Sequence, residues 1–296
     1  MKIGVIGAGV MGRNHLRTIK AMPDVTLVAV ADADAQAGET AAREFGCTLL
    51  PANDFIGKVD AAIIAASTTS HTALAVPLLE AGVHCLVEKP LAASREDCEA
   101  IIDAARVGNA VLQVGHIERF NPAVETLLAS RIPTSVMQRM ATRRFNPGSA
   151  RIKDVDVVVD LMVHDIDAVL ALKRDVEVTK VIARGSADAC EAMLMFADGC
   201  QANLVASRAT TERIRELNVV VPDGVLELNY LARVVRFKHG DHYHDMPNVR
   251  GGEPLANELA DFVKCIRERL TPRVTGADGL KVMDIAWRIQ KALVAS

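Results

Sequence analysis

The first 115 residues alternate short apolar runs with segments whose apolar positions recur every three or four residues. The short runs are typical of buried strands, and the longer period is typical of amphipathic helices. The pattern predicts strands at Lys2–Ile6, Thr26–Ala31, Ala61–Ala65, His84–Val87 and Val111–Gly115, and a short one near Thr48–Leu50. It predicts helices at Val10–Ala21, Ala35–Phe45, Ser70–Ala81 and Ser94–Val107. Such alternation is typical of a parallel sheet with helices on both faces.

After Asn121-Pro122 the pattern changes to β-rich segments separated by hairpin signals at Asp198-Gly199, Asp223-Gly224 and His239-Gly240. We expect a mostly antiparallel sheet here. Helices are predicted near Val159–Leu172, Glu253–Arg269 and Ala277–Leu293. Ala192–Phe196 is apolar at nearly every position, which indicates that both faces of this sheet are covered. Helices cover one face in this interpretation, and a second subunit covers the other, so we expect a homodimer or homotetramer.

Composition narrows the function classes. The 296 residues suit two domains, and 34 Lys+Arg against 37 Asp+Glu give a net charge of −3. No basic field therefore favours nucleic acid or an anionic membrane, and no apolar run approaches the ~18 residues of a membrane span. The six cysteines are scattered without a C-x-x-C pair, which indicates reduced thiols in a cytoplasmic protein.

A glycine-rich turn, Gly7-Ala8-Gly9-Val10-Met11-Gly12, joins the first predicted strand directly to the first predicted helix. In such a turn the first glycine permits the bend, the second lets a pyrophosphate approach, and the third lets the helix pack closely. The helix N-terminus adds free N–H groups and partial positive charge. The turn therefore predicts a dinucleotide site, and the alternative is a glycine turn without a ligand.

Asp32 ends the second predicted strand, 20 residues after Gly12. A carboxylate there can accept both hydroxyls of an adenine ribose and repels a 2′-phosphate. Because no Arg or Lys lies between Ala31 and Gln36, we expect NAD rather than NADP. The alternative is that Asp32 only caps the next helix.

These patterns predict an α/β chain with an N-terminal Rossmann dinucleotide-binding domain and a C-terminal α/β domain built on a mostly antiparallel open sheet. We place the first domain at residues 1–120 and the second, for substrate binding and oligomerisation, at 121–275. The terminal helix, 276–296, is a candidate to pack back on the first domain.

Glu88-Lys89-Pro90 follows the fifth strand, at the carboxyl edge where parallel sheets bind ligands. A lysine there can bond a substrate oxygen and, when partly desolvated, relay a proton. Without a neighbouring ligand, the same three residues are a strand-end turn with solvated charges.

Asp160 and His164 lie at i and i+4 on a predicted helix, with Asp167 one turn further along the same face. A carboxylate beside an imidazole fixes the tautomer and makes the ring a competent general base. The alternative is a solvated helix face. A third candidate segment, from Val114 through His116 and Arg119 to Pro122, leads from the first domain into the second.

The order and spacing of these motifs resemble the glucose-fructose oxidoreductase / inositol dehydrogenase (Gfo/Idh/MocA) family over nearly the whole chain. The resemblance is carried by Gly7 to Gly12, His71 after the fourth strand, Glu88-Lys89-Pro90, Arg119 to Pro122, the Asp160/His164 pair, and the Glu253-Pro254-Leu255 lead into a helix ending near Phe262. Met162 stands where the family often has glycine.

The resemblance implies reversible NAD(P)-dependent oxidation of a sugar or cyclitol hydroxyl, with Lys89 polarising the hydroxyl, His164 as general base and Asp160 as its partner. The expected cofactor-binding residues are Gly7, Gly9, Val10, Met11, Gly12, Asp32, Ser67, His71, Glu88 and Lys89. The expected substrate-binding residues are His116, Arg119, Arg143, Arg151, Asp160 and His164. A rival of another class is a non-catalytic NAD-binding sensor.

Within the family, the runs around Arg119 and His164 resemble UDP-N-acetylglucosamine 3-dehydrogenases, which implies oxidation of the sugar C3 hydroxyl to a ketone. A basic run without an acidic residue is consistent with a sugar-nucleotide diphosphate. It comprises Arg131, Arg139, Arg143, Arg144, Arg151 and Lys153. The alternatives are a free sugar or inositol-like substrate, and a merely solvated strand.

A polar hairpin, His239-Gly-Asp-His242-Tyr-His244, has histidines at spacings that could hold a metal ion. No cysteine is nearby, and the hydride chemistry that the family resemblance implies needs no metal. We therefore expect a polar hairpin rim and no metal site.

Overall fold

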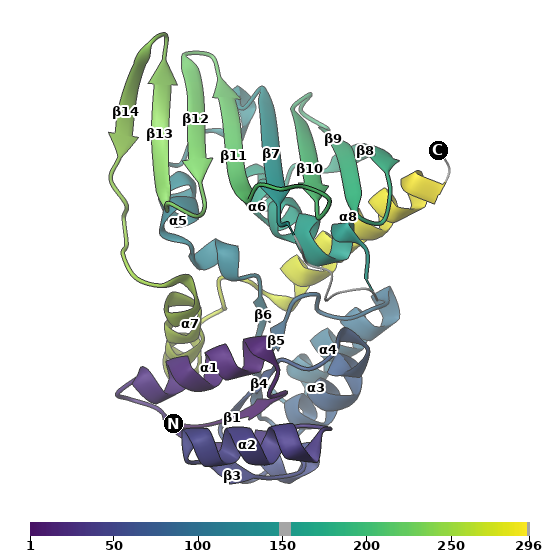
Figure 1. Cartoon of the computed structure of the whole chain (residues 1–296), viewed down its shortest axis with the longest axis vertical. Coiled ribbons are helices and arrows are strands. Elements are labelled where there is room, and N and C mark those ends of the chain that lie inside the picture. Colours follow the sequence, from purple (N-terminus) through teal and green to yellow (C-terminus); the bar gives the residue numbers. More distant parts are fainter. Residues whose placement is uncertain (148–154, 295–296) are drawn as a thin grey trace. The chain divides into compact units, whose positions relative to one another are not determined.

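The structure is a computed structural model that describes residues 1–147 and 155–294 (Figure 1). The chain divides into two compact units. One comprises Met1–Ile117 and Leu255–Leu280, and the other comprises Glu118–Pro254 and Lys281–Ser296.

This division differs from the expected one at residues 118–120, 255–275 and 281–296. Helix α7 (Pro254–Glu268) lies with the first unit because its Leu259, Phe262 and Val263 are buried in the core of the first sheet. Most of α8 (Gly276–Val294) lies with the second unit, where its Met283 and Ile289 are buried.

The first unit contains a parallel sheet of six strands, in the order β3-β2-β1-β4-β5-β6. The strands are β1 (Lys2–Ile6), β2 (Thr26–Ala31), β3 (Thr48–Leu49), β4 (Ala61–Ile64), β5 (His84–Glu88) and β6 (Leu112–Gly115). The helices between them are α1 (Val10–Ala21), α2 (Ala35–Phe45), α3 (His71–Glu80) and α4 (Arg95–Val107). This strand order is that of a Rossmann sheet, which confirms the predicted fold class.

The second unit contains a sheet of eight strands, in the order β14-β13-β12-β11-β7-β10-β9-β8. The strands are β7 (Arg139–Phe145), β8 (Val178–Gly185), β9 (Ala189–Phe196), β10 (Gln201–Ser207), β11 (Ile214–Val221), β12 (Gly224–Asn229), β13 (Val234–His239) and β14 (His242–Met246). Among the described strands of this sheet, only β7 and β10 pair in parallel. The three predicted hairpin turns connect β9 to β10, β11 to β12 and β13 to β14.

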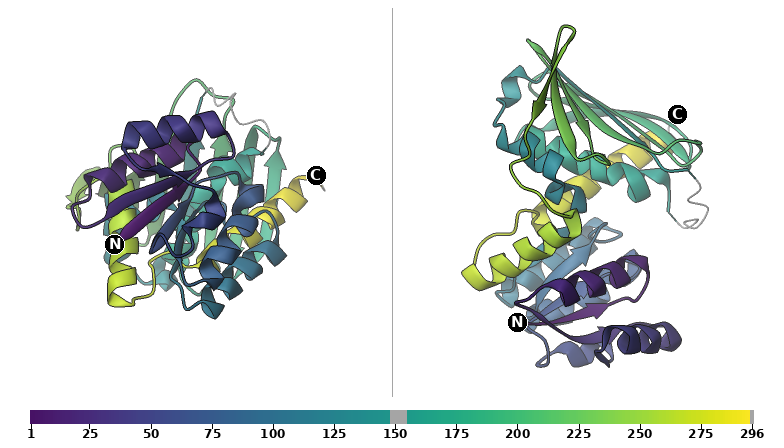
Figure 2. Two further views of the ribbon diagram at one scale, coloured as in Figure 1. Left: turned by 90° about the horizontal axis from the view of Figure 1, so that it is seen from below. Right: turned by 60° about the vertical axis from the view of Figure 1, so that its left-hand side comes forward.

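Helices cover one face of this second sheet, as two further views show (Figure 2). They are α5 (Pro122–Ala129), α6 (Val163–Lys173) and the later part of α8. Along β9, the buried side chains of Cys190, Ala192, Leu194 and Phe196 alternate with half-buried ones. The helix-covered face is therefore the core, and the other face, which carries Met193 and Met195, is half-exposed in a single chain.

The predicted helix Val159–Leu172 begins differently in the structure. Val158–Met162 forms a π-helical turn that leads into α6. The carboxylate of Asp156 accepts the N–H groups of Val158 and Val159, each at 3.0 Å, and so fixes the start of this turn. The expected α-helical start is therefore replaced by a π turn, which places Asp160 on that turn and His164 at the start of α6.

Short 3₁₀ helices occupy Ala52–Phe55, Thr68–Ser70, Ile117–Phe120 and Thr134–Val136. Among the helices that the structure describes, none is both long and apolar enough to cross a membrane.

Candidate functional site

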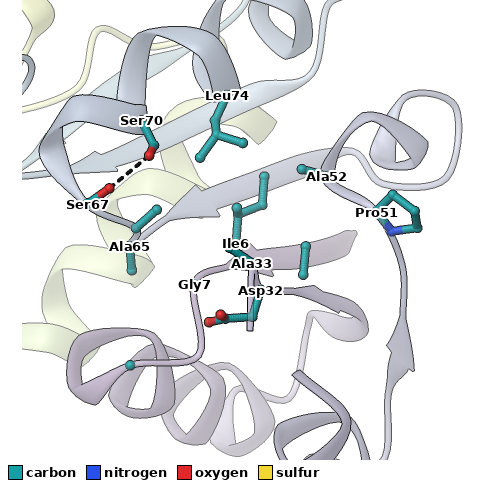
Figure 3. Close-up of a pocket in the computed structure, with 13 residues that line it drawn as sticks. Ile6, Gly7, Asp32, Ala33, Pro51, Ala52, Ala65, Ser67, Ser70 and Leu74 are labelled. Atoms are coloured by element: carbon teal, nitrogen blue, oxygen red, sulfur yellow. Dashed lines mark hydrogen bonds between the residues drawn. The ribbon is translucent and has the colours of Figure 1, made fainter. Parts of the chain in front are cut away.

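A cavity of about 500 Å³ opens at the carboxyl ends of β1, β2 and β4 (Figure 3). The strand order reverses between β1 and β4, which is where open α/β sheets bind ligands. The cavity is lined by Ile6, Gly7, Gly9, Ala31, Asp32, Ala33, Pro51, Ala52, Ala65, Ala66, Ser67, Ser70 and Leu74. Four of these lining residues, Gly7, Gly9, Asp32 and Ser67, are predicted cofactor-binding residues.

The glycine turn has the geometry that a pyrophosphate requires. Gly7 has a φ of +99°, and a β-carbon there would collide with the backbone of Ala65. A β-carbon at Gly12 would collide with the carbonyl of Gly7, so α1 packs closely against the turn. A β-carbon at Gly9 would meet nothing within 4 Å. Gly9 therefore leaves its backbone open to a ligand.

The N-terminus of α1 adjoins this open position. Gly9 is the N-cap residue, and none of the described side chains caps the helix. Its first N–H groups therefore keep hydrogen-bonding capacity for an anionic ligand. Val10 and Met11 are the first two residues of the helix, so their N–H groups are among those that remain available.

The carboxylate of Asp32 lies beside the glycine turn (Figure 3). Oδ2 accepts the N–H of Ala8 at 2.5 Å, and Oδ1 accepts the N–H of Asp34 at 2.8 Å. Asp34, not Asp32, caps α2, because its carboxylate accepts the N–H groups of Gln36 and Ala37. The capping alternative for Asp32 is therefore wrong, and its carboxylate is left to line the cavity.

Ser67 and His71 follow β4. The Ser67 hydroxyl is 2.8 Å from that of Ser70 on the cavity wall. His71 is buried, with Nδ1 3.1 Å from the carbonyl oxygen of Pro90 and Nε2 3.2 Å from that of Ala66. Burial lowers the pKa of His71, and the carbonyls of Leu91, Ala66 and Pro90 partly oppose this effect. His71 thus ties the cavity wall to the loop after Lys89.

Glu88 ends β5 and points inward. Its Oε1 lies 2.6 Å from Nε2 of His15, which is fully buried on α1. Its Oε2 accepts the backbone N–H of Lys89 at 3.3 Å. Glu88 is therefore held inside the first unit, and Lys89, which is half-buried, follows it at the ligand-binding edge of the sheet.

In the second unit, Asp160 is buried and His164 is half-buried. Asp160 Oδ2 lies 3.5 Å from Nη1 of Arg208, which also pairs with Asp188 at 3.0 Å. The sequence did not predict this arginine, because it lies 48 residues further along the chain and no local pattern connects the two.

Arg119 and Asp167 form a buried ion pair, with Nε 2.8 Å from Oδ2. Asp167 is fully buried and holds Arg119 through this ion pair, a contact that the sequence did not predict. His116 is also buried, at the end of the first unit.

The predicted basic run is not one surface. Arg143 and Arg144 are neighbours on β7 and therefore lie on opposite faces of the sheet. Arg143 is exposed and pairs with Glu216 at 2.6 Å. Arg144 is fully buried and donates to Asp165 and Glu118 at 2.9–3.0 Å. Arg151 and Lys153 lie outside the described residues.

In this cluster the positive charge of Arg144 compensates the carboxylates of Asp165 and Glu118, because both lie 2.9 Å from the guanidinium. Burial alone would lower the pKa of Arg144, but Asp165 and Glu118 outweigh it and raise the pKa. The guanidinium also stacks on the ring of Tyr230, 4.9 Å from its centroid. This cluster is part of the interior of the second unit rather than a diphosphate site.

Comparisons with known proteins agree with this geometry. A family model described as an oxidoreductase family with an NAD-binding Rossmann fold matches residues 1–116. The UDP-N-acetylglucosamine 3-dehydrogenase of Acidithiobacillus ferrooxidans is 31% identical, with 100% of this chain and 98% of that protein covered. A solved structure of that enzyme, at the same identity and coverage, superposes with a TM-score of 0.94.

Two further relatives act on inositols. The inositol 2-dehydrogenase of Rhizobium meliloti is 28% identical over 97% of this chain and 94% of its own length. The scyllo-inositol dehydrogenase of Lactobacillus casei, solved with NAD(H) and scyllo-inositol, shares the fold at a TM-score of 0.85 and 21% identity, with 100% and 97% covered. The predicted family is thus confirmed, and the chain belongs to the Gfo/Idh/MocA family of oxidoreductases.

Proposed function

We propose that this protein oxidises a sugar hydroxyl to a ketone with NAD as the hydride acceptor, and that its substrate is UDP-N-acetylglucosamine, oxidised at C3. The cavity at the glycine turn, with Asp32 on its wall, is the observation that carries the dehydrogenase proposal. The full-length similarity to a UDP-N-acetylglucosamine 3-dehydrogenase supports the substrate. The inositol 2-dehydrogenase relative supports a cyclitol as the second candidate.

The residues of the cavity fit NAD. The open backbone at Gly9 and the uncapped start of α1 suit the pyrophosphate, and Asp32 suits the hydroxyls of the adenine ribose. Among the described residues that line the cavity there is no Lys or Arg to neutralise a 2′-phosphate, which favours NAD over NADP. When bound, NAD supplies the acceptor for the hydride.

The catalytic roles follow from the chemistry of the side chains. His164 takes the hydroxyl proton as general base, Lys89 donates to the same oxygen, and Asp160 holds the imidazole in the required orientation. Asp160 also pairs with Arg208, so in this proposal its carboxylate interacts with that guanidinium as well as with the imidazole of His164.

The sugar nucleotide would need cations for its diphosphate. Arg119 and Arg144 are committed to buried carboxylates, so we assign this role to Arg143 and Arg151, with His116 as a further substrate residue. Arg143 lies beside Val205 on the open face of the second sheet, so this role requires that the subunit contact proposed below leave it accessible. Of the three arginines of β7, Arg139 and Arg143 are exposed and Arg144 is buried.

Formation of NADH, followed by absorbance, tests the substrate. We expect a rate with UDP-N-acetylglucosamine that exceeds the rates with inositols and free sugars. Faster oxidation of an inositol would contradict the sugar-nucleotide assignment and favour the second candidate. NAD binding without turnover on any of these compounds would instead favour a sensor protein.

We also propose a homodimer or homotetramer formed through the open face of the second sheet, in a reducing, cytoplasmic environment. Half-buried Met193, Met195 and Val205 and exposed Ile182 lie on that sheet. All six cysteines are free. Light scattering in dilute solution tests the assembly, and a monomer would contradict it.

A further inference from the structure

Three buried side chains meet behind the end of β5, all within the first unit. They are His15 from α1, Glu88 from β5 and Glu258 from α7. One ligand-type atom from each lies within 4.8 Å of the others. In the part of the chain that the structure describes, no other trio of His, Cys, Asp or Glu comes this close.

Glu258 is the unusual member of this trio. It is fully buried, and neither of its carboxylate oxygens has a hydrogen-bond partner among the described residues. Its backbone carbonyl accepts the side-chain N–H of Gln113 at 3.2 Å, which fixes this turn of α7 against β6. A buried carboxylate without a donor costs several kcal/mol, and a proton removes that cost.

The charged groups around Glu258 make an ionised form still less favourable. It faces Glu88 from β5 and His15 from α1, and Asp261 follows one helical turn later on α7. Asp261 is itself 3.9 Å from Arg273, so that arginine compensates Asp261 rather than Glu258. Burial raises the pKa of Glu258 well above its usual range, and Glu88 and Asp261 raise it further.

We propose that Glu258 is a positioning residue that holds a proton at neutral pH and shares it with Glu88, so that the trio fixes the strand end that carries Lys89. Glu88 already accepts from His15 and from the backbone N–H of Lys89, and the carboxylic acid of Glu258 would add a third donor. Gly115 on β6 leaves the space for this carboxylate, since a β-carbon there would lie 2.9 Å from Glu88 Oε2. Loss of the proton would bring two negatively charged carboxylates, those of Glu258 and Glu88, into repulsion directly beside Lys89.

A divalent cation is the other occupant that an imidazole and two carboxylates could hold. Metal bonds to such ligands are about 2.0–2.2 Å long, which keeps neighbouring ligand atoms roughly 3 Å or more apart. The 2.6 Å between His15 Nε2 and Glu88 Oε1 is instead the length of a direct charge-assisted hydrogen bond. The geometry therefore favours a proton.

The pH dependence of stability tests the protonation without any assay of activity. A carboxyl whose pKa is raised by folding stabilises the protein fully below its unfolded-state pKa, and this contribution is lost as pH rises towards the folded-state pKa. Glu258→Gln cannot lose a proton. Relative to wild type, its folded-to-unfolded ratio should rise by up to about tenfold per pH unit above roughly pH 4.3.

The matched control is Glu268→Gln, an exposed Glu on the same helix that pairs with Lys264. Its stability relative to wild type should change little with pH. A difference between Glu258→Gln and wild type that does not change between about pH 5 and about pH 8 would overturn the proposal.

Infrared spectroscopy provides a second measurement that does not depend on unfolding. Wild type at neutral pH should show the carbonyl stretch of a protonated carboxylic acid, and Glu258→Gln should lack it. Its absence from wild type would overturn the proposal. So would one equivalent of a divalent cation in purified wild type that is lost from Glu258→Gln.

The consequence for Lys89 rests on the proposed function and is tested by kinetics. Glu258→Ala should lower kcat by up to about a hundredfold, the effect of a catalytic group misplaced by about 1 Å, while NAD affinity changes little. Glu258→Gln should recover most of this loss and move the alkaline limit of kcat to higher pH. Equal losses in both variants would overturn the positioning role. If wild type oxidises no sugar, the proposed function fails, and the stability and infrared results still decide the protonation.

Discussion

The cluster around Arg144 in the second unit and the candidate NAD site in the first compensate their carboxylates by different means. In the second unit, Glu118 and Asp165 face the fully buried guanidinium of Arg144. In the first unit, Glu88 faces the imidazole of His15, and Asp32 faces backbone N–H groups. Guanidinium pairs are fixed and permanently charged, whereas an imidazole or a carboxyl group can gain or lose a proton as pH changes. Backbone donors can instead exchange one acceptor for another when a ligand binds. The comparison therefore places the adjustable electrostatics with the proposed NAD site and the rigid electrostatics in the interior of the second unit.

Arg144→Met gives the strongest test of the rigid side of this comparison. It leaves Asp165 without its ion-pair partner and Glu118 with only Arg215, 3.7 Å away. Breaking a buried pair in this way costs about 3–5 kcal/mol of unfolding free energy. Denaturant titration measures it. A loss below about 1 kcal/mol would show that the cluster is hydrated or protonated rather than held by Arg144.

Glu88→Gln tests the adjustable side. The amide keeps the shape but cannot accept a charge-assisted bond from His15, so we expect a loss of about 1.5–3 kcal/mol in unfolding free energy. Unfolding with guanidinium chloride at neutral pH measures this loss, and Glu268→Gln is the exposed control. Unchanged stability would mean that His15 and Glu88 are not coupled in solution.

Asp32→Ala tests whether the cavity at the glycine turn binds NAD. Loss of the ribose acceptor should weaken NAD binding by about 1.5–3 kcal/mol, roughly ten- to a hundredfold, and should narrow the preference for NAD over NADP. Calorimetry with each cofactor measures both effects. Asp34→Ala is the neighbouring control, because Asp34 caps α2 and does not line the cavity. Equal NAD affinity in wild type and Asp32→Ala would contradict the proposed site.

Arg143→Ala should have the smallest effect on stability. This exposed arginine pairs with Glu216 across two strands, and such surface pairs are worth about 0–1 kcal/mol. Its affinity for the UDP-sugar should nevertheless fall, because a diphosphate contact is charge-assisted. Calorimetry with UDP-N-acetylglucosamine measures this affinity. No change would remove Arg143 from the substrate site.

Short-range sequence patterns predicted the first unit well, because the residues that begin and end its helices are adjacent to those helices in the sequence. The bounds of α1 and α2 match the expected helices, since the glycine turn opens α1 and the left-handed Gly46 ends α2. The position of the cavity also followed from sequence, because the carboxyl ends of parallel strands meet at one edge.

The partners of charged residues could not be predicted in the same way. Arg119 and Arg144 belonged to segments that suggested substrate contacts, but they bind Asp167 and Asp165, which are 48 and 21 positions away. For Glu258, the sequence showed only that it lies next to Leu259 on a helix whose buried side includes Leu259, Phe262 and Val263. Its neighbours come from α1 and β5, and only tertiary structure brings them together.

The most direct test of the central claim compares wild type with Lys89→Ala, using NADH formation from UDP-N-acetylglucosamine and NAD affinity by calorimetry. We predict that turnover falls by orders of magnitude while NAD affinity stays nearly unchanged, because Lys89 acts on the reacting oxygen. An unchanged rate in Lys89→Ala would contradict the proposal that this lysine, at the end of β5, takes part in the oxidation.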